Sequence, residues 1–184
     1  MSLHARRDLL KFGIASALAL PAGGVLGAAE ARAATEPRKV AFHNLHTGES
    51  LEAVYWDEGD YVPDALHAVN HVLRDFRTGD VHPIEPGLLD LLDQLSSQVE
   101  TRSPFQVISG YRSPKTNAML HERSHGVATH SLHMKGMAID IRLQNIDLPR
   151  LHRAALSMRA GGVGYYPASD FVHVDVGPVR RWGG

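Results

Sequence analysis

The sequence predicts an α+β domain with a small antiparallel sheet, and two observations support this class. Helical patterns occupy much of the first half of the 184-residue chain, whereas short strand patterns dominate the second half. Strands and helices do not alternate regularly, as they would in a parallel α/β sheet. We therefore expect short antiparallel strands with the helices packed on one side of the sheet.

The first residues have the pattern of an exported protein. Arg6 and Arg7 precede an apolar run over residues 12–26, and Ala31-Arg32-Ala33 is a small-x-small cleavage motif. This order is typical of a secretory signal, and the paired arginines indicate the twin-arginine (Tat) type. We expect residues 1–33 to engage the Tat translocase and residues 34–184 to act in the periplasm. An uncleaved anchor is the alternative, although proline and glycine interrupt the apolar run.

The charge of residues 34–184 argues against nucleic acid and membranes as partners. Four of the 19 Lys/Arg and two of the 20 Asp/Glu fall in the signal, so 15 basic and 18 acidic residues remain, a net charge of about −3. Because acidic residues outnumber basic ones, the domain lacks the excess of positive charge that binds nucleic acid or holds a protein stably on anionic lipid. The chain has no cysteine, so any metal site must use nitrogen and oxygen ligands.

The first half of the domain predicts a hairpin followed by two helices. The β-prone segments 40–42 and 51–56 flank a turn at 46–49. A helix is expected from Pro63, because apolar residues recur there at helical spacing. A second helix is expected from Pro86 to Val99. In the helix that begins at Pro63, the apolar residues that recur along one face are Leu66, Val69, Leu73 and Phe76.

The second half predicts short strands around two helices. The strands are expected at 105–108, 137–143, 163–166 and 171–176. Ser113-Pro114 has the form of an N-cap followed by proline at the first helical position, so a short helix toward Glu122 is expected. Residues 124–131 have the composition of a loop. Residues 148–158 form a helical pattern that ends before two glycines.

Two of the 12 histidines are placed to meet an aspartate. Asp140 lies on the polar face of its strand, and His173 lies opposite the valines of the last strand. If the two strands pair, these side chains point the same way, and His133 reaches them from the preceding loop. Two imidazoles and a carboxylate, with a fourth position for water, form a catalytic zinc pattern. Buried, hydrogen-bonded polar residues are the alternative interpretation.

The motifs around these residues resemble those of a known peptidase group. Residues 131–140 resemble the S-x-H-x-x-G-x-A-x-D signature of the D-Ala-D-Ala carboxypeptidase-like (M15-type) zinc peptidases. Residues 170–173 resemble its second signature, with an acidic residue three positions before the last histidine. The stretch from Phe42 to Trp182 is more similar still to the DUF882 group, which includes MepK-like murein endopeptidases. The motifs that carry this similarity are 44–49, 109–117, 131–142 and 162–167.

The resemblance implies a fold of the hedgehog/DD-peptidase type and a role for each site residue. His133, Asp140 and His173 would bind zinc. Asp170 would be the general base, although many relatives have the longer glutamate there. Arg112 would stabilise the oxyanion. A turn-capping aspartate and a structural ion pair are the alternative roles of Asp170 and Arg112.

Four further residues are candidates for supporting roles. Asp175 shares the face of His173 and is expected to orient that ligand. Ser131, Tyr111 and His130 are candidate contacts for the substrate. A loop-holding role for Ser131, packing of Tyr111 against the sheet and a plain loop position for His130 are the alternatives.

The function that follows from the resemblance is a zinc-dependent peptidoglycan endopeptidase that hydrolyses peptide cross-links of the cell wall. A D-Ala carboxypeptidase or dipeptidase with the same metal centre is one alternative. A catalytically inactive peptidoglycan-binding module is another, because fold and metal alone do not make an enzyme. The presence of both Asp170 and Arg112 favours an enzyme.

Overall fold

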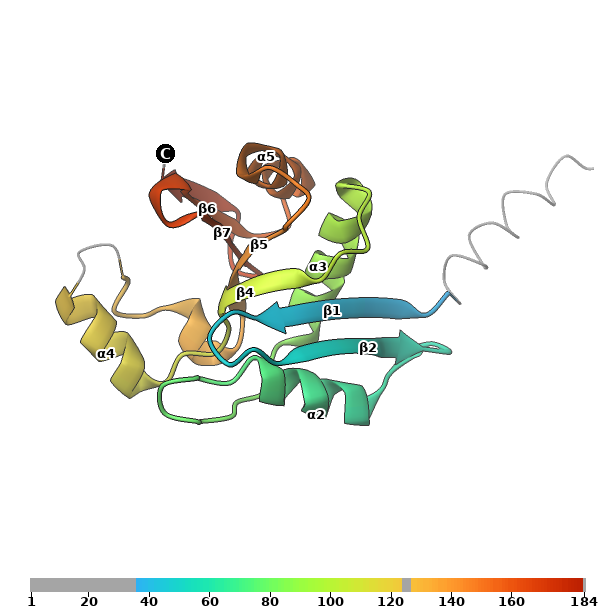
Figure 1. Cartoon of the computed structure of the whole chain (residues 1–184), viewed down its shortest axis with the longest axis horizontal. Coiled ribbons are helices and arrows are strands. Elements are labelled where there is room, and N and C mark those ends of the chain that lie inside the picture. Colours follow the sequence, from blue (N-terminus) through green and yellow to red (C-terminus); the bar gives the residue numbers. More distant parts are fainter. Residues whose placement is uncertain (1–35, 124–126, 184) are drawn as a thin grey trace, which may run out of the picture. The chain divides into compact units, whose positions relative to one another are not determined.

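The structure is a computed structural model that describes residues 36–123 and 127–183 (Figure 1). It begins with the predicted hairpin, in which β1 (Arg38–Asn44) pairs with β2 (Ser50–Asp57), and β3 (Asp60–Tyr61) extends β2. The hairpin turn is fixed by Asn44, whose side-chain oxygen accepts hydrogen bonds from the backbone N–H groups of His46 and Thr47. The predicted signal, residues 1–33, lies outside the described residues.

Four α-helices lie in the described residues, and each begins at or beside a proline, which is pre-shaped for the first helical turn. They are α2 (Pro63–Val72), α3 (Pro86–Gln98), α4 (Pro114–Arg123) and α5 (Leu148–Met158). The expected positions are confirmed, except that α2 ends before Phe76. After Leu73 the backbone turns, because Asp75 accepts a hydrogen bond from the backbone N–H of Arg77 and so favours a non-helical conformation. No helix in the described part of the chain is both long and apolar enough to span a bilayer.

The strands form one sheet in the order β3-β2-β1-β4-β5-β7-β6-β8, and Figure 1 shows β2, β1 and β4 side by side. The α+β class is confirmed. Within the described residues the sheet has eight strands, which is more than expected. It is mixed, because β1 pairs with β4 and β6 with β8 in parallel. Sequence patterns locate strands but do not determine their partners. The remaining strands are β4 (Phe105–Ser109), β5 (Ala138–Arg142), β6 (Gly162–Tyr166), β7 (Phe171–Asp175) and β8 (Arg180–Gly183).

A single apolar core joins one face of the sheet to helices α2, α3 and α5. Strands β5 and β7 contribute Ile139, Ile141, Val172 and Val174 to this core, and all four are buried. Because successive side chains of a strand point to opposite faces, the residues between them must face away from the helices. The core therefore directs Asp140 and His173 to the opposite face.

Asp75 ties the segment after α2 to the start of α4. Its buried carboxylate accepts hydrogen bonds from the backbone N–H groups of Ser113 and Arg77. Burial raises the pKa of Asp75, but hydrogen bonds from Thr116 and Ser113 outweigh burial and bring the pKa down to about 2. The carboxylate therefore favours the folded state only while it is ionised.

We predict that Asp75→Asn lowers the free energy of unfolding at pH 7 by about 1–3 kcal/mol. Since the folded pKa of Asp75 lies below its unfolded value of about 3.9, this stabilisation is complete above that value and is lost as the pH falls toward 2. Urea unfolding between pH 2 and pH 7 measures the difference between variant and parent. Asp80→Asn, at an exposed aspartate of the same loop, is the control. A difference that stays constant across this range would contradict the assignment.

Candidate active site

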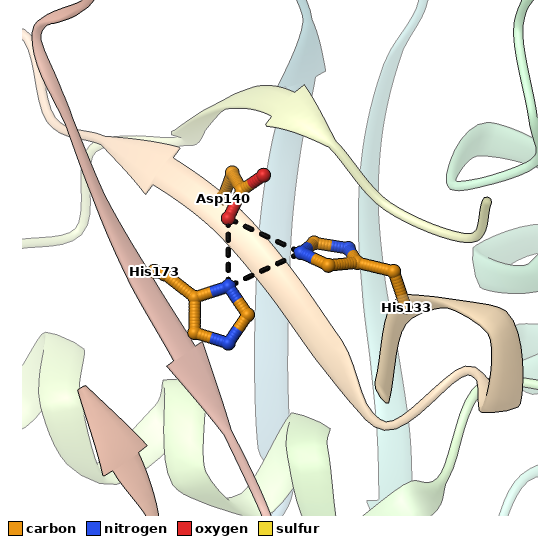
Figure 2. Close-up of side chains that lie close together, drawn as sticks. All are labelled: His133, Asp140 and His173. Atoms are coloured by element: carbon orange, nitrogen blue, oxygen red, sulfur yellow. Dashed lines mark hydrogen bonds and ion pairs between the residues drawn. The ribbon is translucent and has the colours of Figure 1, made fainter. Parts of the chain in front are cut away.

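Three residues predicted as metal ligands lie together on the face of the sheet opposite the helices (Figure 2). Asp140 in β5 and His173 in β7 are direct partners in the antiparallel pair, so their side chains point the same way. His133 comes from η1 (Leu132–Lys135), a 3₁₀ turn just before β5. All three side chains are buried.

The turn that carries His133 is held at both ends. At its start, the Ser131 hydroxyl accepts a hydrogen bond from the backbone N–H of His133. At its end, Gly136 has a φ of 67° and lies against the backbone of Pro83, where a Cβ atom would be 2.1 Å from the carbonyl oxygen. Only glycine fits such a position. His133 was expected in a loop, and these contacts give it a fixed place.

The facing atoms of the three residues form a small triangle. His133 Nε2 lies 3.2 Å from Asp140 Oδ1 and 3.1 Å from His173 Nδ1, and the His173–Asp140 distance is 2.8 Å. The far side of each ring has an acceptor: His133 Nδ1 lies 2.7 Å from the Gly110 carbonyl oxygen and His173 Nε2 lies 3.0 Å from Asp175 Oδ2. Hydrogen bonds to these acceptors place the ring protons there, and the nitrogen lone pairs then face Asp140.

This arrangement fits a zinc ion. Ligand atoms at about 2.0–2.1 Å from one tetrahedral ion lie about 3.3 Å apart, close to the triangle found. Two imidazole lone pairs and a carboxylate oxygen repel one another unless a positive charge lies between them. The donor set of two histidines and one carboxylate is also one that zinc uses in hydrolytic sites. The residues present therefore suit zinc.

The electrostatics of the triangle favour a bound cation. Burial raises the pKa of Asp140, but His133 and His173 outweigh it and hold the pKa well below its ordinary value. Burial lowers the pKa of His133, which keeps that ring neutral as a ligand must be. Burial opposes charge on His173 as well, yet hydrogen bonds to Asp140 and Asp175 raise its pKa to about 9, so the ring binds a second proton, on Nδ1, which a metal ion would displace. The two carboxylates thus attract positive charge to this ring.

Arg112 reaches the same centre from the loop after β4. Its Nη2 atom lies 3.4 Å from Asp140 Oδ2 and 3.3 Å from Ser109 Oγ, and its backbone N–H donates to the His133 carbonyl oxygen. Burial lowers the pKa of Arg112, an effect that Asp140 opposes. Its buried Nε atom has no hydrogen-bond partner within the described residues. Arg112 also lines the cavity beside the triangle, where a guanidinium is well suited to a developing negative charge.

A cavity of about 560 Å³ opens over the three ligands and Arg112. His130 and Ser131, two of the expected substrate contacts, line it. Tyr111 is not among the lining residues, and its ring stacks on His82 at 4.7 Å. Tyr166, which lies in the motif at 162–167, also lines the cavity. Sequence reasoning missed two large lining residues, Arg180 and Trp182, because the short strand β8 that carries them has no recognisable motif.

Asn117 is a supporting residue that sequence reasoning also missed. It lies in α4, and its side-chain amide donates to the carbonyl oxygens of Ala128 and Thr129. These bonds anchor the segment that brings His130 to the cavity. Its position within the motif at 109–117 was the only sequence signal for this role.

Asp170 lies at the rim of the cavity. Its neighbours Ser169 and Phe171 line the cavity, while its own exposed carboxylate accepts a hydrogen bond of 2.7 Å from Arg142. It has a φ of 54° and follows the short turn η2 (Pro167–Ser169), as expected for a residue in the turn before β7. The structure therefore brings Asp170 close to the site's edge but not onto the triangle.

Asp175 makes the contact expected of it. Its carboxylate has no exposed surface and accepts from His173 Nε2, which fixes the orientation of that ring. The Asp175 carboxylate also accepts hydrogen bonds from the backbone N–H groups of Gly162 and Gly177 and from the guanidinium of Arg180.

Comparison with known proteins identifies the family of this chain. The profile of the peptidoglycan L,D-endopeptidase MepK family matches residues 32–182. The peptidoglycan L,D-endopeptidase MepK of Escherichia coli strain K12 is 51% identical over 146 residues, which are 79% of this chain and 80% of that protein. The probable peptidoglycan L,D-endopeptidase MepK of Haemophilus influenzae is 42% identical over 150 residues, 81% of each chain. The predicted resemblance is confirmed, and this chain belongs to the peptidoglycan L,D-endopeptidase MepK family.

Proposed function

We propose that this chain is a zinc-dependent endopeptidase that cleaves L,D peptide bonds in peptidoglycan. The observation that carries the proposal is the triangle of His133, Asp140 and His173, which presents three zinc-type donors at the base of a cavity. Membership of the MepK family supplies the substrate class. It also favours an endopeptidase over a D-Ala carboxypeptidase or dipeptidase with the same metal centre.

The chemistry divides between the metal and the residues around it. His133, Asp140 and His173 would hold the zinc ion, which would supply a Lewis acid to polarise the scissile carbonyl and to make the attacking water more acidic. Arg112 stabilises the negative charge that develops on the carbonyl oxygen, since its guanidinium lines the cavity and lies beside Asp140. His130 and Ser131 contact the peptide where they line the cavity.

Asp170 is the proposed general base, which takes a proton from the attacking water and delivers it to the leaving amine. To act, its carboxylate has to leave Arg142 and turn toward the cavity. The pair is partly exposed, with 61% of the Asp170 side chain accessible. An exposed pair of this kind contributes about 0–1 kcal/mol, so its opening costs little. The ion pair is also the one observation that favours an inactive binding module.

The location and the fold family belong to the same proposal. The Tat pattern in residues 1–33 and a substrate in the cell wall both favour a periplasmic protein, exported by the Tat translocase as a folded, zinc-loaded domain. A catalytic triangle on the free face of an α+β sheet also supports a relation to the DD-peptidase and hedgehog folds.

Purified protein is expected to hold about one zinc ion per chain and to lose hydrolytic activity when a chelator removes it. His133→Ala should abolish zinc binding, because two remaining ligands do not form a closed site. Metal analysis by mass spectrometry measures the stoichiometry. His67→Ala, at an exposed histidine of α2, is the matched control and should bind zinc like the parent. Full zinc content in His133→Ala would contradict the ligand assignment.

Asp170→Ala should retain zinc and lower kcat by about 10²–10⁴-fold on cross-linked muropeptides. Mass spectrometry of the digests identifies the cleaved bond. Glu58→Ala is the matched control, since Glu58 is also exposed, acidic and in the left-handed region, with a φ of 50°.

Arg142→Met should leave Asp170 free and keep activity at or above the parental level.

Parental activity in Asp170→Ala would show that another group is the base. Zinc-loaded parent protein that leaves all muropeptides intact would instead indicate a binding module.

A further inference from the structure

Strand β6 has glycine at two positions on the face that carries the metal triangle, beside His173 and Asp175. Gly164 is the partner of His173 in the β6–β7 pair, so it faces the same side, as does Gly162 two residues earlier. On its other edge β6 pairs in parallel with β8, where Gly162 lies beside Arg180 and Gly164 beside Trp182. Two glycines therefore separate the edge strand from β7.

The side chains of β8 fill the space that these glycines leave. A Cβ atom at Gly162 would lie 2.5 Å from Arg180 Nη1 and 2.5 Å from Asp175 Oδ2. A Cβ atom at Gly164 would lie 2.7 Å from the Trp182 ring. Trp182 lies against His173, with ring centroids 5.1 Å apart, and the Arg180 guanidinium lies 5.0 Å from the Trp182 ring. Arg180 and Trp182 thus cross β6 to reach the residues of β7.

The contact between Arg180 and Asp175 is a two-point ion pair. Arg180 Nη1 lies 3.0 Å from Asp175 Oδ1 and Nη2 lies 2.7 Å from Oδ2. The same Oδ2 atom accepts the hydrogen bond from His173 Nε2. A planar guanidinium that binds both oxygens fixes the plane of a carboxylate as well as its position. The direction of the bond to His173 is fixed with it.

We propose that Arg180 is a positioning residue that holds His173 in its metal-binding orientation through Asp175, and that Gly162 preserves the space for this contact. The inference rests on the proposed zinc site. Asp175 has no exposed surface, so without Arg180 its charge is balanced only by His173 and by backbone N–H groups. The carboxylate then tilts, and the Nδ1 atom of His173 leaves the triangle.

The test measures the zinc dissociation constant by competition with a chromogenic chelator. Arg180→Met, which keeps the aliphatic stem but removes both donors, should weaken zinc binding by about 10–100-fold. Arg180→Lys should recover part of the affinity, because lysine restores the charge without the planar fork. Arg181→Met is the matched control on the opposite face of β8 and should bind zinc like the parent. Parental affinity in Arg180→Met would overturn the proposal.

A second variant separates positioning from a loss of folding. Gly162→Ala forces the Arg180 and Asp175 side chains apart without changing any charge, so it should also weaken zinc binding. Combined with Arg180→Met, it should add little, because both changes disrupt one contact. Fully additive losses would show that Gly162 acts independently of Arg180. Thermal unfolding of the chelator-treated variants measures how far each substitution destabilises the fold itself. The loss in free energy of zinc binding should exceed this loss in free energy of unfolding.

A readout independent of zinc distinguishes this proposal from the proposed function. The Nε2–H signal of His173 in ¹H–¹⁵N NMR reports its hydrogen bond to Asp175. It should shift or broaden in Arg180→Met and stay unchanged in Arg181→Met. Parent protein that binds no zinc would contradict the proposed function, while an unchanged His173 signal in Arg180→Met would contradict the positioning role.

Discussion

The antiparallel pairing of β5 with β7 is the constraint on which the site depends. It sets Asp140 opposite His173, and the apolar residues on either side of each ligand must face the helices. A slip of one residue in either strand would bury a ligand in the core and expose a core residue on the other face. The register that packs the core is therefore also the register that assembles the ligands. Selection for a stable sheet and selection for the proposed metal site would act on the same pairing.

Basic and acidic side chains alternate through the site and form one connected network. Arg180 binds Asp175, Asp175 binds His173, His173 contacts Asp140, and Asp140 lies beside Arg112. Each carboxylate is enclosed by groups that carry or can accept positive charge. Apart from Arg180, whose side chain is 43% exposed, these groups are largely shielded from water. Loss of one member therefore leaves a buried neighbour without a partner, and buried unpaired charge is costly. The residues around the ligands are thus coupled to them energetically as well as geometrically.

Local patterns allowed much of the fold and of the site to be predicted from the sequence. Proline at helix starts located all four described helices, and the alternation in β5 and β7 put Asp140 and His173 on one face. The strand β8 was not predicted, because its four residues have no apolar alternation and its partner is a parallel strand. Arg180 and Trp182 were missed for the same reason. Their importance depends on two glycines in another strand, and no local pattern connects them.

The carboxylate of Asp170 shows a different limit of sequence reasoning. Its place in the turn before β7 was predictable from Pro167-Ala168-Ser169, whereas its contact with Arg142 was not, since that contact joins the turn to a residue of β5 that is 28 positions away in the sequence. A signature motif specifies which residue is present. The orientation of an exposed side chain depends on neighbours that the motif does not contain.

The three proposed ligands are dispersed over η1, β5 and β7, which would couple metal binding to folding. An unfolded chain holds His133 and His173 40 residues apart, so it offers no preformed site, and an ion that bridges the triangle binds the native state almost alone. Such an ion stabilises the domain by mass action, at about 1.4 kcal/mol for each tenfold excess of free metal over its dissociation constant. Cellular zinc supply would then help to determine what fraction of the chains is folded, in addition to what fraction is active.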